Sequence, residues 1–252
     1  MPKEILVALG LLLPLLGTAL GAAGALLPRT IDPTKERCAL GFAAGVMLAA
    51  SVWSLLLPAI DFAAEAGSPP WISSCLGFLA GMGSLLLLRQ LLDARCRQEA
   101  KAERRAFLLA GSVTLHNIPE GLAVGVAFAS ALQNDTSLAG AMALAFGIAV
   151  QNIPEGGIIA LPLALSGKSR ARACRAGVLS GVVEPLAAIM ALLLTAFVRP
   201  LLPWVLSFAA GCMFFVVTEE LLRTPEEDES FAGTAGAALG FSLMMLLDVA
   251  LG

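Results

Sequence analysis

Charged residues in this chain fall in clusters, and the stretches between the clusters are long enough to cross a lipid bilayer. About 20 apolar residues in a helix span a ~30 Å hydrocarbon core. Stretches of that length with no more than one charge each occur at 5–28, 38–60, 66–88, 106–134, 136–167, 176–198, 200–218 and 230–247. They lack the alternation of a transmembrane β-strand, so the chain is predicted to cross the membrane as helices.

Composition supports the same fold class. The chain is 58% hydrophobic and 14% charged, whereas soluble domains are about 25% charged. We expect an all-α integral membrane protein whose residues 1–252 form a single transmembrane domain. The first span exceeds the 7–15-residue core of a signal peptide, so we expect it to be retained. Eight transmembrane helices are predicted at about 4–28, 38–62, 70–92, 104–132, 137–165, 170–198, 201–223 and 231–251.

Basic residues predict the orientation. The loops at 29–37, 89–105, 168–175 and 223–230 hold every Lys and Arg except Lys3 and Arg199. With eight helices, these four loops lie on one side, which the positive-inside rule makes cytoplasmic. We therefore expect a cytoplasmic basic loop at about 89–105 and both termini outside. The net charge of −3 leaves no basic surface for nucleic acid.

Two related motifs occur within neighbouring spans, HNIPEG at 116–121 and QNIPEG at 151–156. Residues four apart share a helix face, which pairs His116 with Glu120 and Gln151 with Glu155. Each proline lacks an N–H and leaves a carbonyl without its helical partner, a loss that is tolerable where the carbonyl lines a cavity or binds an ion. We expect these two helices to be kinked around a central site, and Glu184-Pro185 repeats the device in the sixth span.

Three buried glutamates in consecutive spans require neutralisation. Each costs roughly 2.5–3.5 kcal/mol on insertion scales, and no Lys or Arg lies at comparable depth. One imidazole, three carboxylates and several amide oxygens suit a borderline dication such as Zn²⁺. His116 is the only histidine, and a packing role is its simplest alternative. The rival function is a proton-linked carrier of an organic solute that uses the glutamates as a proton relay.

These motifs, together with GFAAGVMLAASVWSLLLPAI, SGVVEPLAA, FAAGCMFFVVTEEL and GFSLMMLLDVALG, resemble the Zrt/Irt-like (ZIP) family of divalent metal transporters, most closely its GufA-type branch. The resemblance covers essentially the whole chain. It implies a two-metal transport site in which Glu120 and Glu155 bridge the ions. The first metal position would hold His116, Glu120, Gln151, Glu155 and Met47. The second would hold Asn117, Asn152 and Glu184. Some relatives carry Asp in place of Asn152, which makes the second position here one charge poorer.

The resemblance also implies metal positions at the two mouths of the pathway, Glu219 and Glu220 on the cytoplasmic side and Asp61 nearer the outer side. It suggests an elevator-like movement of the motif helices in a homodimer. Runs of small residues at 17–25, 77–83 and 233–240 permit close helix contacts, and we expect these contacts to lie within one monomer.

We therefore predict a transporter, not an enzyme, with no cofactor. It would carry Zn²⁺ first, also Cd²⁺ and in some measure Fe²⁺ or Mn²⁺, into the cytoplasm. Its partners would be the metal ions and the lipid bilayer. It would be a multi-pass protein of the plasma membrane, the inner membrane in a bacterium. An intramembrane metalloenzyme is disfavoured because one histidine cannot supply HExxH or a histidine trio.

Overall fold

Helices make up almost all of the part of the chain that the structure describes. A computed structural model describes residues 2–27, 33–95, 101–133, 137–165, 167–221 and 231–251, apart from some side chains within the helices. The long helices are α1 (Lys3–Ala23), α2 (Pro33–Ala50), α4 (Pro70–Arg95), α5 (Lys101–Leu132), α6 (Leu138–Leu165), α7 (Arg170–Gly181), α8 (Val183–Leu193), α10 (Leu202–Val216) and α11 (Ala232–Leu251). The shorter ones are η1 (Gly24–Leu26), η2 (Ser51–Leu56), α3 (Leu57–Glu65), α9 (Thr195–Val198), η3 (Arg199–Leu201) and η4 (Val217–Leu221).

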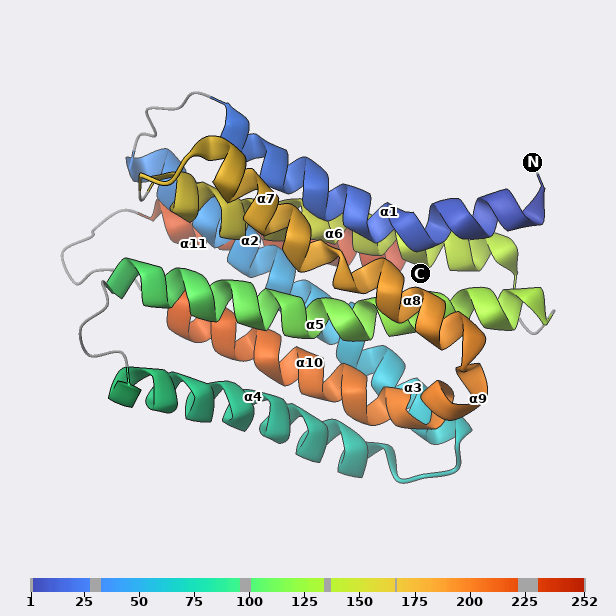
Figure 1. Ribbon diagram of the computed structural model, residues 1–252. Helices are drawn as coiled ribbons and strands as arrows, with labels where there is room; N and C mark the ends of the chain where they lie inside the picture. Colours follow the sequence, from blue (N-terminus) through green and yellow to red (C-terminus); the bar gives the residue numbers. More distant parts are fainter. Residues whose placement is uncertain are drawn as a thin grey trace.

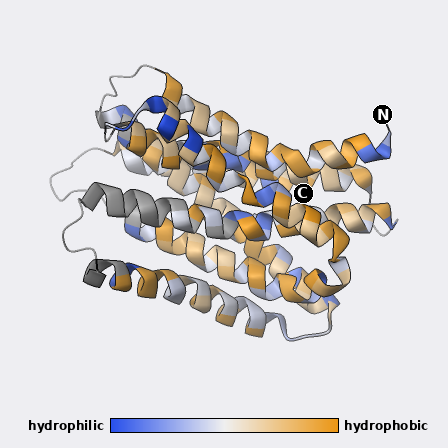
Figure 2. Cartoon of the chain, viewed as in Figure 1, coloured by the Kyte–Doolittle hydropathy of each residue, from blue (hydrophilic) through white to orange (hydrophobic). Residues whose placement is uncertain are grey.

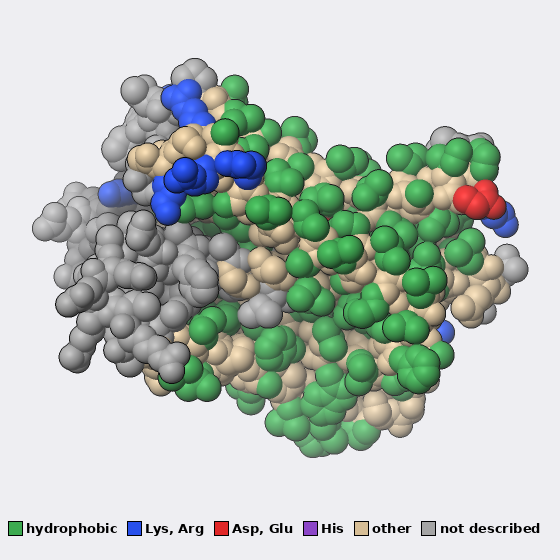
Figure 3. Space-filling view, viewed as in Figure 1, with side chains coloured by type: hydrophobic (Ala, Val, Ile, Leu, Met, Phe, Trp, Pro, Cys, Tyr) green, Lys and Arg blue, Asp and Glu red, His purple; other side chains and the backbone are tan. Residues whose placement is uncertain are grey.

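The helices have the length and hydropathy of a membrane bundle. Among the described residues, seven helical segments are long and apolar enough to cross a bilayer, and Asn117–Leu132 of α5 is a shorter apolar one. Apolar residues cover the middle of the bundle, and charges gather towards its ends (Figures 2 and 3). Large apolar side chains such as Leu20, Leu79 and Phe197 are more than 60% exposed. Such a surface matches hydrocarbon rather than water.

The prolines of the predicted spans act differently in different helices. Helix α5 continues through Pro119, and α6 continues through Pro154. The predicted segment 170–198 is instead divided into α7, α8 and α9, with the first break at Val182. Pro185 has no N–H for the carbonyl of Gly181, which explains an interrupted hydrogen-bond ladder at that turn.

Small residues bring particular helix pairs into backbone contact. An added Cβ at Gly17 of α1 would lie 1.9 Å from the carbonyl oxygen of Ala149 in α6, and one at Gly121 of α5 would lie 2.3 Å from that of Glu184 in α8. An added Cβ at Gly45 of α2 would lie 2.0 Å from the carbonyl oxygen of Ala237 in α11, and one at Gly81 of α4 would lie 1.9 Å from that of Phe208 in α10. The small-residue runs therefore pack within the monomer, as predicted.

These contacts divide the bundle into two groups. Helices α1, α5, α6, α7 and α8 pack on one another, and we call them the motif group (Figure 1). Helix α2 packs on α11, α4 packs on α10, and α3 and η2 join these two pairs, so we call them the second group. Close glycine contacts occur within each group, whereas contacts between the groups, such as α5 with α10, are less extensive.

Several connections between long helices lie at the same end of the bundle (Figure 1). The ends of α1, α4, α6 and α10 lie with the starts of α2, α5, α7 and α11 at one end of the bundle (Figure 1). Exposed Arg170, Arg172 and Arg175 belong to the first turns of α7, which begins at this end (Figure 1). Lys3 and Glu4 begin α1 at the opposite end, near the N-terminus (Figure 1). Among the described residues, the α7 arginines thus lie at one end, and Lys3 and Glu4 lie at the other.

Candidate metal site

The polar side chains of both motifs converge in the interior of the motif group. Helix α5 supplies Asn117 and Glu120, α6 supplies Gln151, Asn152 and Glu155, and α8 supplies Glu184. All six are at most 1% exposed. Spacings of three and four residues place them on one face of each helix, and the Gly121 contact brings α8 against α5 at this level. Local helical spacing and one close helix contact thus assemble the site.

Glu184 is surrounded by hydrogen-bond donors. The amide of Asn117 donates to its Oε1 at 2.8 Å, and the amide of Asn152 donates to its Oε2 at 2.8 Å. A third donor is the hydroxyl of Thr18 in α1, 3.0 Å from Oε1. Three donors stabilise a buried carboxylate in its charged form. The structure therefore joins Asn117, Asn152 and Glu184 by hydrogen bonds and adds Thr18, which was not predicted.

Glu120 belongs to a second polar chain that leads away from the basic end. The amide of Gln151 donates to Glu120, and the hydroxyl of Ser54 in η2 lies 3.2 Å from Gln151 Oε1 and 2.9 Å from Asp248 Oδ1 in α11. One hydroxyl hydrogen serves one of these two acceptors at a time. Neither Ser54 nor Asp248 was predicted. A carboxylate in an otherwise apolar terminal helix is the signal that could have found Asp248, but this residue directly follows the uncharged stretch 230–247, where a charge also fits the boundary of a span.

The carboxylates lie close enough for their charges to interact, Glu120 with Glu155, Glu184 and Asp248, and Glu184 with Glu155. Within the described side chains, however, no three His, Cys, Asp or Glu residues are grouped tightly enough to hold a metal by themselves. The carboxylates of the site alternate with amide side chains, so an ion bound here would need amide oxygens as well as carboxylate oxygens as ligands.

Several buried acceptors support that requirement. Among the described residues, Asn117 Oδ1, Asn152 Oδ1 and Glu120 Oε2 accept no hydrogen bond although they are fully buried. A buried polar atom without a partner costs about 1–3 kcal/mol. Oxygen atoms that lack donors and lie beside negative charge are suited to a cation, and amide and carboxylate oxygens are ligands of divalent metals.

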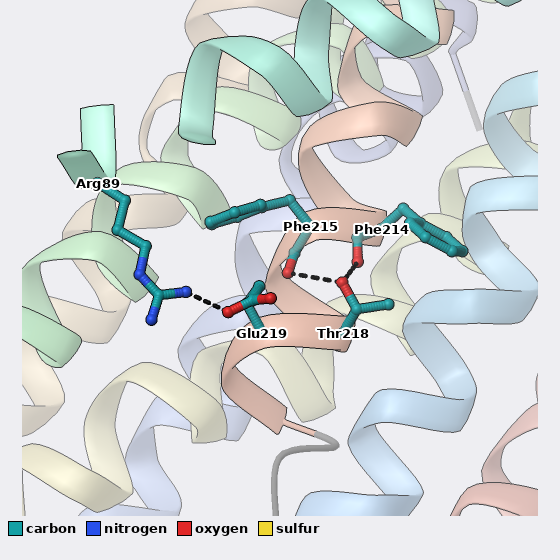
Figure 4. A network of polar contacts seen from close by, with 5 residues as sticks. All are labelled: Arg89, Phe214, Phe215, Thr218 and Glu219. Atoms are coloured by element: carbon teal, nitrogen blue, oxygen red, sulfur yellow. Dashed lines mark hydrogen bonds and ion pairs between the residues drawn. The ribbon is translucent and has the colours of Figure 1, made fainter. Parts of the chain in front are cut away.

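Glu219, predicted at the cytoplasmic mouth, is paired with a cation of the protein itself. The guanidinium of Arg89 in α4 donates to the carboxylate of Glu219 in η4 (Figure 4). The hydroxyl of the preceding Thr218 lies 2.9 and 3.2 Å from the carbonyl oxygens of Phe214 and Phe215 and donates to one of them at a time, where α10 passes into this wider π-helical turn (Figure 4). Turns of this kind are frequent at functional sites.

Met47 and Asp61, two further predicted residues, do not join the network of described side chains. Met47 of α2 is fully buried in the main apolar cluster, and Asp61 of α3 is exposed. His116 lies in α5 and Glu220 in η4, but their side chains are outside the described ones. Their roles as ligands stay predictions.

Several known proteins are similar in sequence to this chain. Residues 92–248 match the family model described as ZIP Zinc transporter. The chain is 37% identical to Zinc transporter ZIPB of Bordetella bronchiseptica, over 93% of this chain and 78% of that protein. It is 33% identical to Zinc transporter ZIP11 of Homo sapiens, over 94% and 97%, and 39% identical to Zinc transporter GufA of Myxococcus xanthus, over 58% and 56%. With its seven apolar helices, the chain is a multi-pass integral membrane protein that belongs to the ZIP family.

Proposed function

We propose that this protein transports a divalent transition metal, Zn²⁺ foremost, across the membrane into the cytoplasm. The observation that carries the proposal is the buried set of carboxylate and amide oxygens contributed by α5, α6 and α8, several of which have no donor. The relatives reported above, which match most or much of this chain, are named zinc transporters. Cd²⁺, Fe²⁺ and Mn²⁺ are the further cargoes proposed from the ligand set.

The proposed site has two metal positions. Glu120, Gln151 and Glu155, with His116 and Met47, would form the first. Asn117, Asn152 and Glu184 would form the second, with Glu120 and Glu155 shared. Because Asn152 is neutral, two dications would meet only three carboxylates. We therefore expect the first position to fill at lower zinc concentration than the second.

The proposed orientation places eight spans in the membrane with the basic end of the bundle in the cytoplasm. Asp248, Ser54 and the exposed Asp61 would then lie on the outer side of the site. Glu219 and Glu220 would lie on the cytoplasmic side. A metal would pass from Asp248 to the central carboxylates and leave past Glu219, where Arg89 offers the carboxylate an alternative counter-ion.

The proposed movement is a displacement of the motif group relative to the second group. In its support, the site residues on α5, α6 and α8 belong to one group, and the closest backbone contacts lie within groups rather than between them. Backbone contact resists sliding more than side-chain contact, because packed backbones cannot adapt by changing rotamers. Kinks at Pro119 and Pro154, and a homodimer built on the second group, are further parts of this proposal.

The test is metal flux in proteoliposomes that contain the purified protein. Zinc applied on one side should accumulate inside vesicles in proportion to the protein, and Cd²⁺ should compete with it. Runs with and without a pH gradient would separate this function from its rival. A proton-linked organic solute carrier would show solute-dependent proton movement and no zinc flux, and that pair of results would refute the proposal.

Replacing Asp248 by Asn is expected to raise the KM for zinc uptake with little change in the maximum rate. A carboxylate beside the pathway attracts the entering dication, and losing roughly 1–2 kcal/mol of that attraction corresponds to a rise in KM of about tenfold. Zinc-dependent uptake rates measure it. The control is Glu65→Gln, which removes a carboxylate that is 59% exposed and paired with Arg199 at the bundle surface. An unchanged KM in Asp248→Asn would remove this residue from the pathway.

A further inference from the structure

The hydroxyl of Thr18 has two acceptors within reach and only one hydrogen to give. Thr18 Oγ1 lies 3.0 Å from Glu184 Oε1 and 3.3 Å from the backbone oxygen of Pro14. The residue is fully buried in α1. Since a hydroxyl donates one hydrogen bond, these two contacts are alternatives that a rotation about one bond exchanges.

The surroundings of Thr18 hold it at this position. An added Cβ at Gly156 of α6 would lie 2.0 Å from the backbone oxygen of Thr18, and one at Gly181 of α7 would lie 2.8 Å from its Cβ. Two glycines on two helices thus form the cradle in which this β-branched side chain sits. The Thr18 side chain is therefore fixed in place, and only its hydroxyl group can still rotate.

Pro14 O is also used by the second metal position. The amide of Asn152 donates to Pro14 O at 3.3 Å and to Glu184 Oε2 at 2.8 Å. An amide nitrogen cannot ligate a cation, so a metal bound by Asn152 and Glu184 requires the amide oxygen in its place. When the amide turns, Pro14 O and Glu184 both lose a donor. The metal replaces the donors at Glu184, and the hydroxyl of Thr18 is the nearby donor that can replace the one at Pro14.

We propose that Thr18 is a positioning residue that controls occupancy of the second metal position. Without metal there, its hydroxyl donates to Glu184 and, with Asn117 and Asn152, occupies the carboxylate. With metal there, it donates to Pro14 and leaves Glu184 Oε1 to the ion. Glu184 and Pro14 O then each keep a partner in both states, which keeps the position easy to fill and easy to empty. This inference rests on the proposed metal transport.

Thr18→Val is the test because it keeps the branched shape and removes the hydroxyl. The bond lost without metal is to a charged carboxylate, and the bond lost with metal is to a neutral carbonyl. Bonds to charged groups are the stronger ones, so zinc affinity at the second position should rise by about tenfold in Thr18→Val. Release slows, and the maximum rate of zinc uptake falls. Thr18→Ser keeps the hydroxyl and should behave as wild type.

Zinc bound per protein, measured over a range of free zinc in detergent, gives two binding steps. The step lost in Glu184→Gln identifies the second position. Thr195→Val is the matched control, because the hydroxyl of Thr195 donates to the carbonyl oxygen of Ala191 or of Leu192 in the preceding turn rather than to the site. If Thr18→Val does not fold, Thr18→Ala, which cannot crowd the cradle, takes its place in the same measurements.

The inference is supported if the second binding step has a higher zinc affinity in Thr18→Val and the wild-type affinity in Thr18→Ser. An unchanged second step, or equal behaviour of the Ser and Val variants, overturns it while wild-type zinc flux continues. A wild type that neither binds nor transports zinc overturns the proposed function instead, so the two failures are distinguishable.

Discussion

Glu155→Gln should abolish zinc uptake by proteoliposomes, with a fall of at least about thirtyfold. Glu155 is fully buried and lies in α6 among the other carboxylates of the site. Glutamine preserves its size and removes its charge. Removing one partner of a buried charge pair costs roughly 2–5 kcal/mol, which corresponds to a factor of about 30 or more. The loss should appear in zinc binding as well as in uptake.

The control for this variant is Glu4→Gln, which neutralises an exposed carboxylate at the start of α1. Zinc uptake by His116→Ala should fall as it does for Glu155→Gln. Arg97→Ala, which changes the basic loop, should take up zinc at the wild-type rate. Uptake by Glu155→Gln equal to that of Glu4→Gln would show that the central carboxylate does not hold the ion. The site assignment would then have to be abandoned.

Gly156→Ala should destabilise the protein strongly, whereas Gly157→Ala should not. At Gly156 an added Cβ would lie 2.0 Å from the backbone oxygen of Thr18 and 2.8 Å from the backbone nitrogen of Ala22. Helix α1 would have to move away, because backbone atoms cannot rotate aside as a side chain does. Overpacking of this kind costs about 1–3 kcal/mol or more. The expected results are a lower midpoint of thermal unfolding in detergent and reduced zinc uptake.

Gly157 provides a control from the same motif. The nearest atoms to a Cβ there would be Gly21 O and Leu161 Cδ1, each at 3.8 Å, which is ordinary contact. Gly157→Ala should therefore unfold at the wild-type temperature and transport zinc at the wild-type rate. Equal stability of the two variants would mean that α1 and α6 do not meet at Gly156. It would also undermine the cradle proposed for Thr18.

Much of the architecture was predictable because membrane helices are marked by local features. Uncharged stretches predicted an all-helical membrane protein, since lipid tolerates few charges and requires internal backbone hydrogen bonds. Helical spacing predicted that His116 and Glu120, and likewise Gln151 and Glu155, share a face. The small-residue runs predicted close contacts within the monomer. The exact ends of helices, including the break at Val182, depend on how individual turns are satisfied.

The sequence by itself determined the helical membrane fold and the two motif faces, because periodicity and the exclusion of charge from lipid act along the chain. Only the tertiary structure decided which distant side chains complete the site. Thr18 meets Glu184 across 166 positions and Ser54 meets Asp248 across 194. Such contacts depend on which helices pack together and in what register, and no single helix carries that information.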